Sequence, residues 1–293
     1  MRPTRVVRVL APNPSPYTLE GTNTWVVGPP PAIVVDPGPD DDGHLRDVAR
    51  EAGAIGAIVL THSHPDHAPG APRLAAWSGA IVHAYRPPDG GERLREARPI
   101  RSGDAELVPL ATPGHTPDHV AFWLAADRAL FTGDAVLGRG TSVIDPPEGD
   151  LAAYLRSLRR MLELRPTTAY PGHGPVVLDA SEKLREYERH RAERERQIVD
   201  ALGSGERSVD ELVSVIYAGY AEDVRPLAAR SVLAHLEKLE AEGAVARPSP
   251  NGGGYRLLDP RGCERCGRPV AANARLCERC RLAALQESPA PDA

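Results

Sequence analysis

The first 180 residues alternate short apolar runs with polar turns and amphipathic stretches. The apolar runs are rich in valine and isoleucine and are bounded by proline and glycine, which is typical of β-strands. We predict strands at 5–10, 24–27, 32–35, 54–60, 80–84, 105–110, 119–124 and 129–132. Apolar residues at helical spacing predict helices at 44–53 and 150–164. Strands and helices in this alternation predict an α/β fold, a sandwich of layered sheets.

The pattern changes near residue 180. A long charged helix is predicted over 181–205, followed by helices at 208–219 and 225–243 and a β-hairpin with a glycine-rich tip at 244–259. Three helices and a hairpin in this order suggest a winged-helix-like module. The composition shifts again after residue 260 to a cysteine- and arginine-rich tail. We therefore predict three parts: a catalytic domain over 1–180, a winged-helix-like domain over 181–258, and a small tail over 259–293.

The composition is that of an ordinary globular protein. Of 293 residues, 41% are hydrophobic and 26% charged, and the formal net charge of −5 gives no overall argument for nucleic-acid binding. No run approaches 18 uninterrupted apolar residues, and the N-terminus has no apolar signal region, so neither a membrane span nor a signal peptide is predicted. The cysteines are confined to the tail rather than spread through the fold, and a cytoplasmic location is expected.

A dense histidine cluster follows the apolar strand predicted at 54–60. The segment "THSHPDHAPG" places three histidines and one aspartate within six positions: His62, His64, Asp66 and His67. Imidazole and carboxylate groups suit zinc or another first-row metal. The alternative is a solvated histidine-rich loop. Further candidates lie in turns that follow later apolar strands: His115, Asp134 and His173.

Together these seven side chains resemble the ligand pattern of the metallo-β-lactamase superfamily, over about residues 15–178. The resemblance implies an αβ/βα sandwich that holds two metal ions, usually zinc, with manganese or iron as alternatives. It assigns His62, His64 and His115 to one site and Asp66, His67 and His173 to the other, and it makes Asp134 the bridge between them.

The chemistry of such a site follows from its charge. Two divalent ions lower the pKa of a bridging water to roughly 7, so that hydroxide is available at neutral pH. Such a centre hydrolyses esters, thioesters, lactams or phosphodiesters. We expect Asp66 and Asp134 to be essential for catalysis. His119 is a third candidate, either as a proton donor to the leaving group or as a residue that orients the loop of His115.

Three further segments narrow the resemblance: "NPSPYTLEGTNTWVVG", "GHTPDH" and "PGHGP". They resemble the beta-lactamase-like protein 2 branch, whose members carry a winged-helix-like C-terminal domain and include endoribonucleases that act on single-stranded RNA. The resemblance implies a phosphodiesterase acting on RNA. The alternative is a hydrolase of a small thioester, ester or lactone, and a third hypothesis is a binding module without catalysis. Tyr17, Thr22 and Asn23 either line the cleft or form an ordinary turn.

The tail contains two CxxC pairs, formed by Cys263, Cys266, Cys277 and Cys280. This spacing suits one structural zinc ion held by four thiolates, with disulfides or redox thiols as alternatives. Positions 261–281 carry six arginines and two glutamates, a local charge of about +4 that would suit RNA or an acidic partner. The winged-helix-like part has balanced charge, so we expect it to form a wall of the cleft or a homodimer surface.

Overall fold

The computed structural model of the chain describes residues 3–247, 254–259 and 270–271. The chain divides into two compact units, Met1–His190 and Arg191–Ala293. Helix α4 (Ala180–Leu202) contains the boundary between them. Each unit is described by itself.

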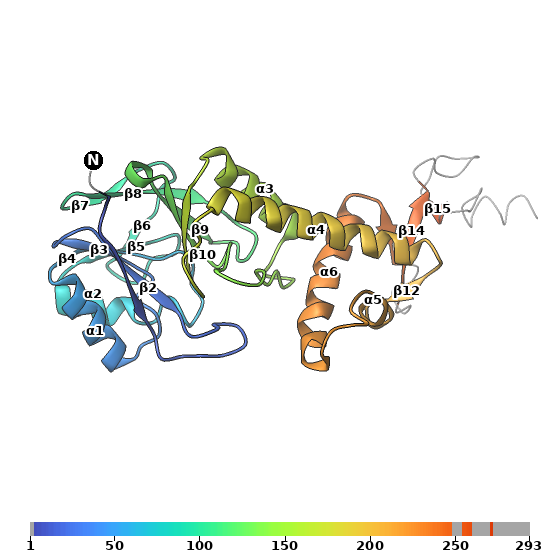
Figure 1. The fold of residues 1–293 in the computed structure, drawn as a ribbon, viewed down its shortest axis with the longest axis horizontal. Coiled ribbons are helices and arrows are strands. Elements are labelled where there is room, and N and C mark those ends of the chain that lie inside the picture. The colour runs from blue at the N-terminus through green and yellow to red at the C-terminus, as the bar shows by residue number, and fades with distance from the viewer. Residues whose placement is uncertain (1–2, 248–253, 260–269, 272–293) are drawn as a thin grey trace, which may run out of the picture. The chain divides into compact units, whose positions relative to one another are not determined.

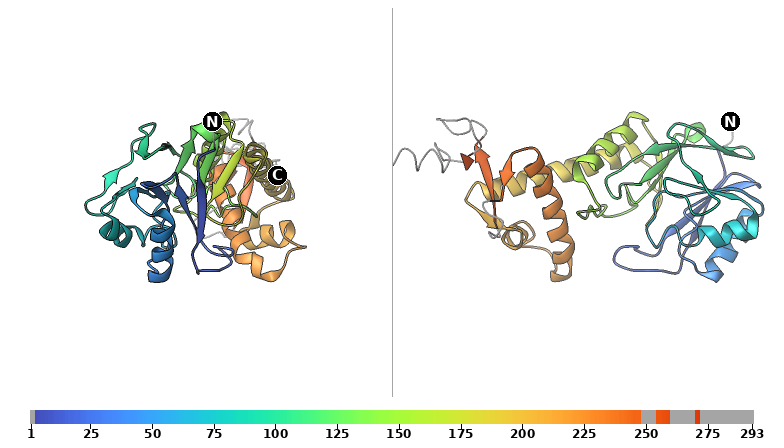
Figure 2. Two further views of the ribbon diagram at one scale, coloured as in Figure 1. Left: turned by 60° about the vertical axis from the view of Figure 1, so that its left-hand side comes forward. Right: turned by 180° about the vertical axis from the view of Figure 1, so that it is seen from behind.

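The first unit contains two sheets (Figures 1 and 2). The first sheet has strands in the order β1 to β6: Val6–Leu10, Asn23–Val27, Ala32–Val35, Ile55–Val59, Ile81–Ala84 and Glu92–Arg93. Strands β3, β4, β5 and β6 are parallel, with Val35 of β3 opposite Val59 of β4. The carboxyl ends of these strands, and the loops that follow them, therefore meet at one edge of the sheet.

The second sheet has the order β11–β10–β9–β8–β7. In chain order its strands are β7 to β11: Ile100–Ser102, Ala105–Ala111, Val120–Leu124, Ala129–Gly133 and Thr168–Pro171. Strands β10 and β11 are parallel and the other pairs are antiparallel. The backbone N–H of Val120 donates to the carbonyl of Thr61 at 2.7 Å, which joins the two sheets beside the loop that follows β4.

Alternate strand residues separate the two layers of core. Trp25, Ile33, Phe122 and Phe131 are buried between the sheets. The other face of the first sheet packs against α1 (Asp42–Ala52) and α2 (Ala71–Ser78), which lie together on one side in Figures 1 and 2. The outer face of the second sheet is covered by α3 (Leu151–Glu163), whose Tyr154 hydroxyl donates to the carbonyl of Ala135 at 2.7 Å. This αβ/βα layering confirms the predicted fold class.

The second unit is a small helical module with a short sheet. It contains the end of α4, then β12 (Arg207–Ser208), α5 (Val209–Ile216), α6 (Arg225–Ala241), β13 (Val245–Ala246), β14 (Gly254–Asp259) and β15 (Val270–Ala271). Helix α5 begins with a capping box between Ser208 and Glu211. The core of the second unit is made of aliphatic side chains, chiefly from α4, α5 and α6, together with Tyr255 of β14. The predicted sequence of helices and hairpin is confirmed.

Several predictions concern residues that the structure does not describe. The four cysteines lie at positions 263, 266, 277 and 280, outside the described residues, so the proposed zinc site of the tail stays a prediction. The division at residues 180 and 258 falls within the described residues, and it also stays a prediction. Within the described part of the chain, none of the helices combines the length and apolar character that crossing a membrane requires.

Candidate metal centre

Loops from both sheets bring the predicted metal-binding side chains together. The loop after β4 carries His62, His64, Asp66 and His67, and the remaining three follow β8, β10 and β11: His115, Asp134 and His173. They form three overlapping groups in which the ligand atoms lie within 4.8 Å of one another. All seven predicted side chains therefore meet at one place.

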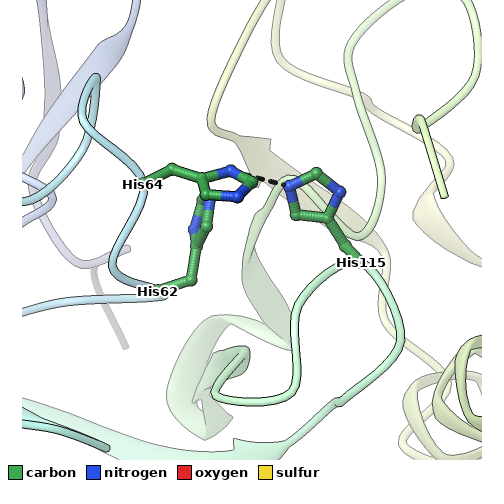
Figure 3. Close-up of side chains that lie close together, drawn as sticks. All are labelled: His62, His64 and His115. Atoms are coloured by element: carbon green, nitrogen blue, oxygen red, sulfur yellow. Dashed lines mark hydrogen bonds between the residues drawn. The ribbon is translucent and has the colours of Figure 1, made fainter. Parts of the chain in front are cut away.

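The first group consists of His62, His64 and His115 (Figure 3). The ring of His64 lies 4.6 Å from that of His62 and 4.8 Å from that of His115, measured between centroids. His115 Nε2 is 3.2 Å from His64 Nδ1. The three rings thus converge from two loops that are 51 residues apart in the sequence.

The second group consists of Asp66, His67 and His173. His173 Nε2 lies 3.1 Å from Asp66 Oδ2 and 3.3 Å from His67 Nε2. Asp134 lies between the two groups. Its Oδ1 atom is 3.4 Å from His67 Nε2 and 3.3 Å from His173 Nε2, and its Oδ2 atom is 3.8 Å from His115 Nε2.

Asp36 orients two of these histidines: it contacts His67 directly and His62 through the hydroxyl of Thr61. Its Oδ2 accepts a hydrogen bond from the Thr61 hydroxyl at 2.7 Å and lies 2.9 Å from His67 Nδ1. The Thr61 hydroxyl has one proton and gives it to Asp36, so it must accept from His62 Nδ1, which is 2.9 Å away. The hydrogen-bond network therefore assigns the proton to Nδ1 in His62 and His67, and it leaves the lone pair on Nε2 facing the cluster.

The outer nitrogens of the other histidines face acceptors as well. His115 Nδ1 lies 2.7 Å from the carbonyl of Val143, and His173 Nδ1 lies 3.2 Å from the carbonyl of Gly21. His64 is reversed: its Nε2 lies 3.5 Å from Glu148 Oε2 and its Nδ1 faces inward. Five inner imidazole nitrogens, which are the atoms able to bind a metal ion once deprotonated, consequently point toward a common centre.

The electrostatics of the cluster favour a positive charge there. Burial alone would lower the pKa of His173, but Asp134 and Asp66 raise it to about 9. His67 is fully buried, yet the carboxylates of Asp134 and Asp36 raise its pKa well above the ordinary value. Burial would raise the pKa of Asp66, but His173 and His67 lower it below the ordinary value. The anionic and imidazole groups thus stabilise a cation between them.

His119 has both ring nitrogens engaged. Its Nδ1 lies 2.8 Å from the Thr112 hydroxyl, and its Nε2 accepts from the backbone N–H of Asp134 at 3.2 Å. Burial, together with the neighbouring His115, lowers the pKa of His119 to about 3. The neutral ring contacts Thr112, which begins the loop of His115, and it also holds the backbone of Asp134, so its contacts are those expected of the positioning alternative. Its catalytic assignment stays a prediction.

A cleft of about 310 Å³ opens onto the cluster. Besides five of the seven candidate ligands, it is lined by apolar or aromatic side chains and by two further acids: Tyr17, Pro65, Leu137, Val143, Asp145 and Glu148, with Ser142. None of these described lining residues is a lysine or an arginine. The cleft is therefore acidic around an apolar wall, apart from any cation that the cluster binds.

Two residues that support the cluster were not assigned from the sequence: Asp36 was not predicted, and the role of Asn23 was left open. Asp36 follows β3 in "VVDPG", where it looks like an ordinary turn residue. Its signal was a carboxylate placed directly after a buried parallel strand, beside the strand that leads to His62. Asn23, left open between cleft and turn, donates to the carbonyls of Pro171 and Gly174 at 2.9 and 2.8 Å and so fixes the turn of His173.

The turn before His173 also requires glycine. A Cβ atom on Gly172 would lie 2.4 Å from Asp134 Oδ1 and 2.7 Å from His67 Cε1. Any side chain there would displace the candidate ligands. The sequence "PGHGP" is therefore explained by close backbone approach to the cluster.

Comparison with known proteins shows the family of the chain. Residues 17–173 match the metallo-beta-lactamase superfamily, and residues 208–252 match the beta-lactamase associated winged helix domain. The chain belongs to the metallo-β-lactamase superfamily. It is a hydrolase of that fold, and the winged-helix-like part predicted from the sequence is confirmed.

Relatives within the superfamily span most of the chain. A Caenorhabditis elegans protein named beta-lactamase-like protein 2 homolog is 36% identical over 262 residues, which cover 83% of this chain and 86% of that protein. The predicted branch is therefore confirmed. An Aspergillus chevalieri protein named atrochrysone carboxyl ACP thioesterase is also 36% identical, over 83% of each chain. A solved metallo-beta-lactamase family protein from Thermus thermophilus shares the fold with a TM-score of 0.73, 24% identity, and coverage of 86% of this chain and 98% of that one.

The metallo-β-lactamase fold implies a bound divalent metal ion, and the donor set of this chain fits one. Among the described residues, the buried His62 Nε2 atom has no hydrogen-bond partner. The Nε2 atoms of His67 and His173 face each other at 3.3 Å although each ring directs its Nδ1 toward an acceptor. A shared proton satisfies this pair in the metal-free protein, and a metal ion that accepts both lone pairs satisfies it equally, since the neighbouring carboxylates favour either cation.

Proposed function

We propose that this metallo-β-lactamase-fold enzyme hydrolyses thioesters that carry an apolar acyl group. The observation that carries the proposal is the cleft lining, where Leu137, Val143 and Tyr17 offer an apolar wall and no lysine or arginine is among the described lining residues. The 36% identity to a protein named as an acyl carrier protein thioesterase supports the same reaction class.

The charge of the cleft favours a thioester over RNA. A single-stranded RNA carries one negative charge per nucleotide, and proteins bind it through basic grooves and exposed aromatic platforms. Here the lining carries Asp145 and Glu148, and none of its described residues is a lysine or an arginine. The acyl group of a thioester is uncharged, so these carboxylates do not oppose its entry.

We assign the metal sites by extending the family pattern to this chain. His62, His64 and His115 would hold one zinc ion, Asp66, His67 and His173 the second, and Asp134 would bridge them. Bound there, such ions supply a water of lowered pKa and polarise a carbonyl oxygen. Asp36 and Thr61 hold the rings of His62 and His67 in the tautomer that offers Nε2.

The leaving group also suits this arrangement. A thiol has an ordinary pKa of about 8.5, so a thiolate leaves without prior protonation far more readily than an alkoxide. His119 holds no proton on Nε2, since that atom accepts from the backbone N–H of Asp134. A substrate that needs no general acid therefore matches the side chains that surround the cluster.

One assay separates thioester hydrolysis from RNA cleavage. The zinc-loaded full chain is incubated with acyl-pantetheine and acyl-coenzyme A thioesters of increasing acyl length, with thiol release as the readout, and in parallel with an end-labelled single-stranded RNA. We expect thiol release that rises with acyl length, that is abolished in Asp66→Asn, and that persists in the exposed control variant Asp104→Asn. RNA cleavage without thioester turnover would show that the proposal is wrong and that the phosphodiesterase hypothesis holds.

A further inference from the structure

A second cleft, of about 200 Å³, lies where β5 and β6 of the first sheet meet β7 and the segment before it. Its lining contains four arginines and one carboxylate: Arg93, Arg95, Arg98, Arg101 and Glu92. The strands β5, β6 and β7 that border it are labelled in Figure 1. In a chain whose formal net charge is −5, this is a local concentration of positive charge.

Two of these arginines are free to bind an anion. Arg101 is paired with Glu106 at 2.6 Å, and Arg93 lies over the ring of Tyr85 with 4.9 Å between its Cζ atom and the ring centroid. Within the described chain, neither Arg95 nor Arg98 forms an ion pair with a carboxylate, and both side chains are exposed. The single carboxylate of the lining, Glu92, faces His83 at 3.6 Å.

This cleft is separate from the metal centre. Gly56 and Ala57, at the beginning of β4, form part of its wall, whereas His62 follows the end of the same strand. The linings of the two clefts share no residue, and Gly56 precedes His62 by six residues, up to about 20 Å of extended chain. The two clefts are therefore distinct, and their lining residues have opposite charge.

We propose that the arginine-lined cleft binds the phosphate groups of a small nucleotide-type ligand. A guanidinium group offers paired N–H donors that match phosphate oxygens, and it stays charged at all relevant pH values. Ile81 and Leu94 supply apolar surface in the same lining, and Ile81 is 43% exposed. Guanidinium groups can bind the phosphate while the apolar wall contacts a nucleoside. This lining therefore fits a phosphate joined to a nucleoside better than it fits inorganic phosphate.

Two sources carry this chemistry: a free nucleoside diphosphate, and the phosphorylated adenosine end of a coenzyme A thioester. Binding to the cleft does not depend on thioester hydrolysis, so the proposal stands or falls independently of the function proposed above. ADP represents the first source, and adenosine 3′,5′-bisphosphate represents the second without a thiol that could reach the metal centre.

Isothermal titration of the zinc-loaded full chain with these two compounds, and with adenosine as the uncharged reference, tests the proposal. We expect saturable binding of at least one phosphate compound, no binding of adenosine, and a loss of affinity of about tenfold or more in the double variant Arg95→Gln/Arg98→Gln. The matched control, Arg46→Gln/Arg50→Gln, removes the same charge from helix α1, where both arginines are paired with aspartates.

Each outcome decides the proposal. Tighter binding of the bisphosphate identifies a coenzyme A end as the source, and equal or tighter binding of ADP identifies a free nucleotide. An affinity that is unchanged in Arg95→Gln/Arg98→Gln, or lowered equally in the control, overturns the proposal, as does the absence of saturable binding in the unmodified chain. Circular dichroism of both double variants verifies that the fold is retained.

Discussion

The two clefts of the first unit differ in how their charge is held. Around the metal centre the carboxylates are fixed: Asp36 is 2% exposed and accepts three hydrogen bonds, and Asp134 bridges the two histidine groups. In the second cleft, Arg95 and Arg98 are exposed and lie on a turn segment between β6 and β7. The first cleft holds rigid carboxylates and imidazoles that can bind a cation, whereas the second presents solvent-exposed guanidinium groups that can bind an anion.

This difference has an energetic reason. A buried charge costs several kcal/mol unless its partners are fixed around it, so the metal centre needs a complete network of outer hydrogen bonds. An exposed guanidinium remains hydrated and needs no such support. We therefore expect substitutions at the metal centre to have large effects that reach beyond the substituted residue, and substitutions of exposed charges to have local ones.

The largest effect is expected from Asp134→Asn. This change removes the negative charge shared by the two groups, and the loss of a few kcal/mol of transition-state stabilisation corresponds to a decrease of about a thousandfold in kcat/KM for a thioester. Metal analysis should show less than the full complement of bound zinc. Binding of ADP to the arginine-lined cleft should change by no more than about twofold, because distant sites act independently. A parallel loss of ADP binding would break the distinction between the clefts.

Asp36→Asn is expected to have the next largest effect. Asparagine tolerates the positive φ of 50° at this position and retains an oxygen for the N–H of Thr61, but its amide nitrogen cannot accept from His67 or from the Thr61 hydroxyl. Zinc affinity, measured by competition with a chelator, should fall by about 10- to 100-fold. Asp40→Asn is the matched control, since Asp40 pairs with Arg73 on the surface. Equal losses in both variants would contradict a special role for Asp36.

The residues involved in these two predictions show what the sequence could and could not provide. Seven ligand candidates were predictable because histidine and aspartate side chains recur directly after apolar strands, and loops at the carboxyl ends of parallel strands gather at one edge. Asp36 was missed because a single aspartate before "PG" has the composition of any turn. Its role depends on the pairing of β3 with β4, which places it beside Thr61.

The fold was predictable for similar reasons, and its omissions have physical causes. Most of the predicted strands and helices are present within one or two residues of their expected ends. Helix α2 was missed because it has only eight residues and begins with alanine and proline. The arginine-lined cleft was invisible in the sequence, since Arg95 and Arg98 are interspersed with glutamates, and only the fold pairs Glu96 with Arg160 outside the lining.

A third prediction concerns pH and removal of the metal. In the metal-free protein the carboxylates raise the folded-state pKa of His173 to about 9 from an ordinary value of 6.5. A raised folded-state pKa contributes stability that is complete below pH 6.5 and is lost as the pH rises through about 9. The melting temperature of the chelator-treated protein should therefore fall between these pH values. That of the zinc-loaded protein should fall less, because the metal ion replaces the proton.

The control for this pH dependence is His173→Gln. This variant lacks the titrating ring, so its metal-free form should lose less melting temperature between pH 6.5 and 9 than the metal-free unmodified chain. Scanning fluorimetry over this range with and without zinc gives both comparisons. An equal decrease in the variant would assign the pH dependence to other groups.

The smallest effect is expected from Glu148→Gln. Like Asp36, Glu148 faces the outer nitrogen of a candidate ligand, but the contact to His64 is 3.5 Å long and the glutamate side chain is 55% exposed. An exposed contact of this kind contributes up to about 1 kcal/mol, so kcat/KM for a thioester should fall by no more than about fivefold.

Because Glu148 also lines the cleft, the substitution makes the cleft less acidic. The KM for an uncharged thioester should stay unchanged, whereas a marked gain in RNA binding would indicate that this carboxylate normally excludes a polyanion. A loss of zinc affinity as large as that expected for Asp36→Asn would instead show that an exposed carboxylate orients a ligand histidine as effectively as a buried one.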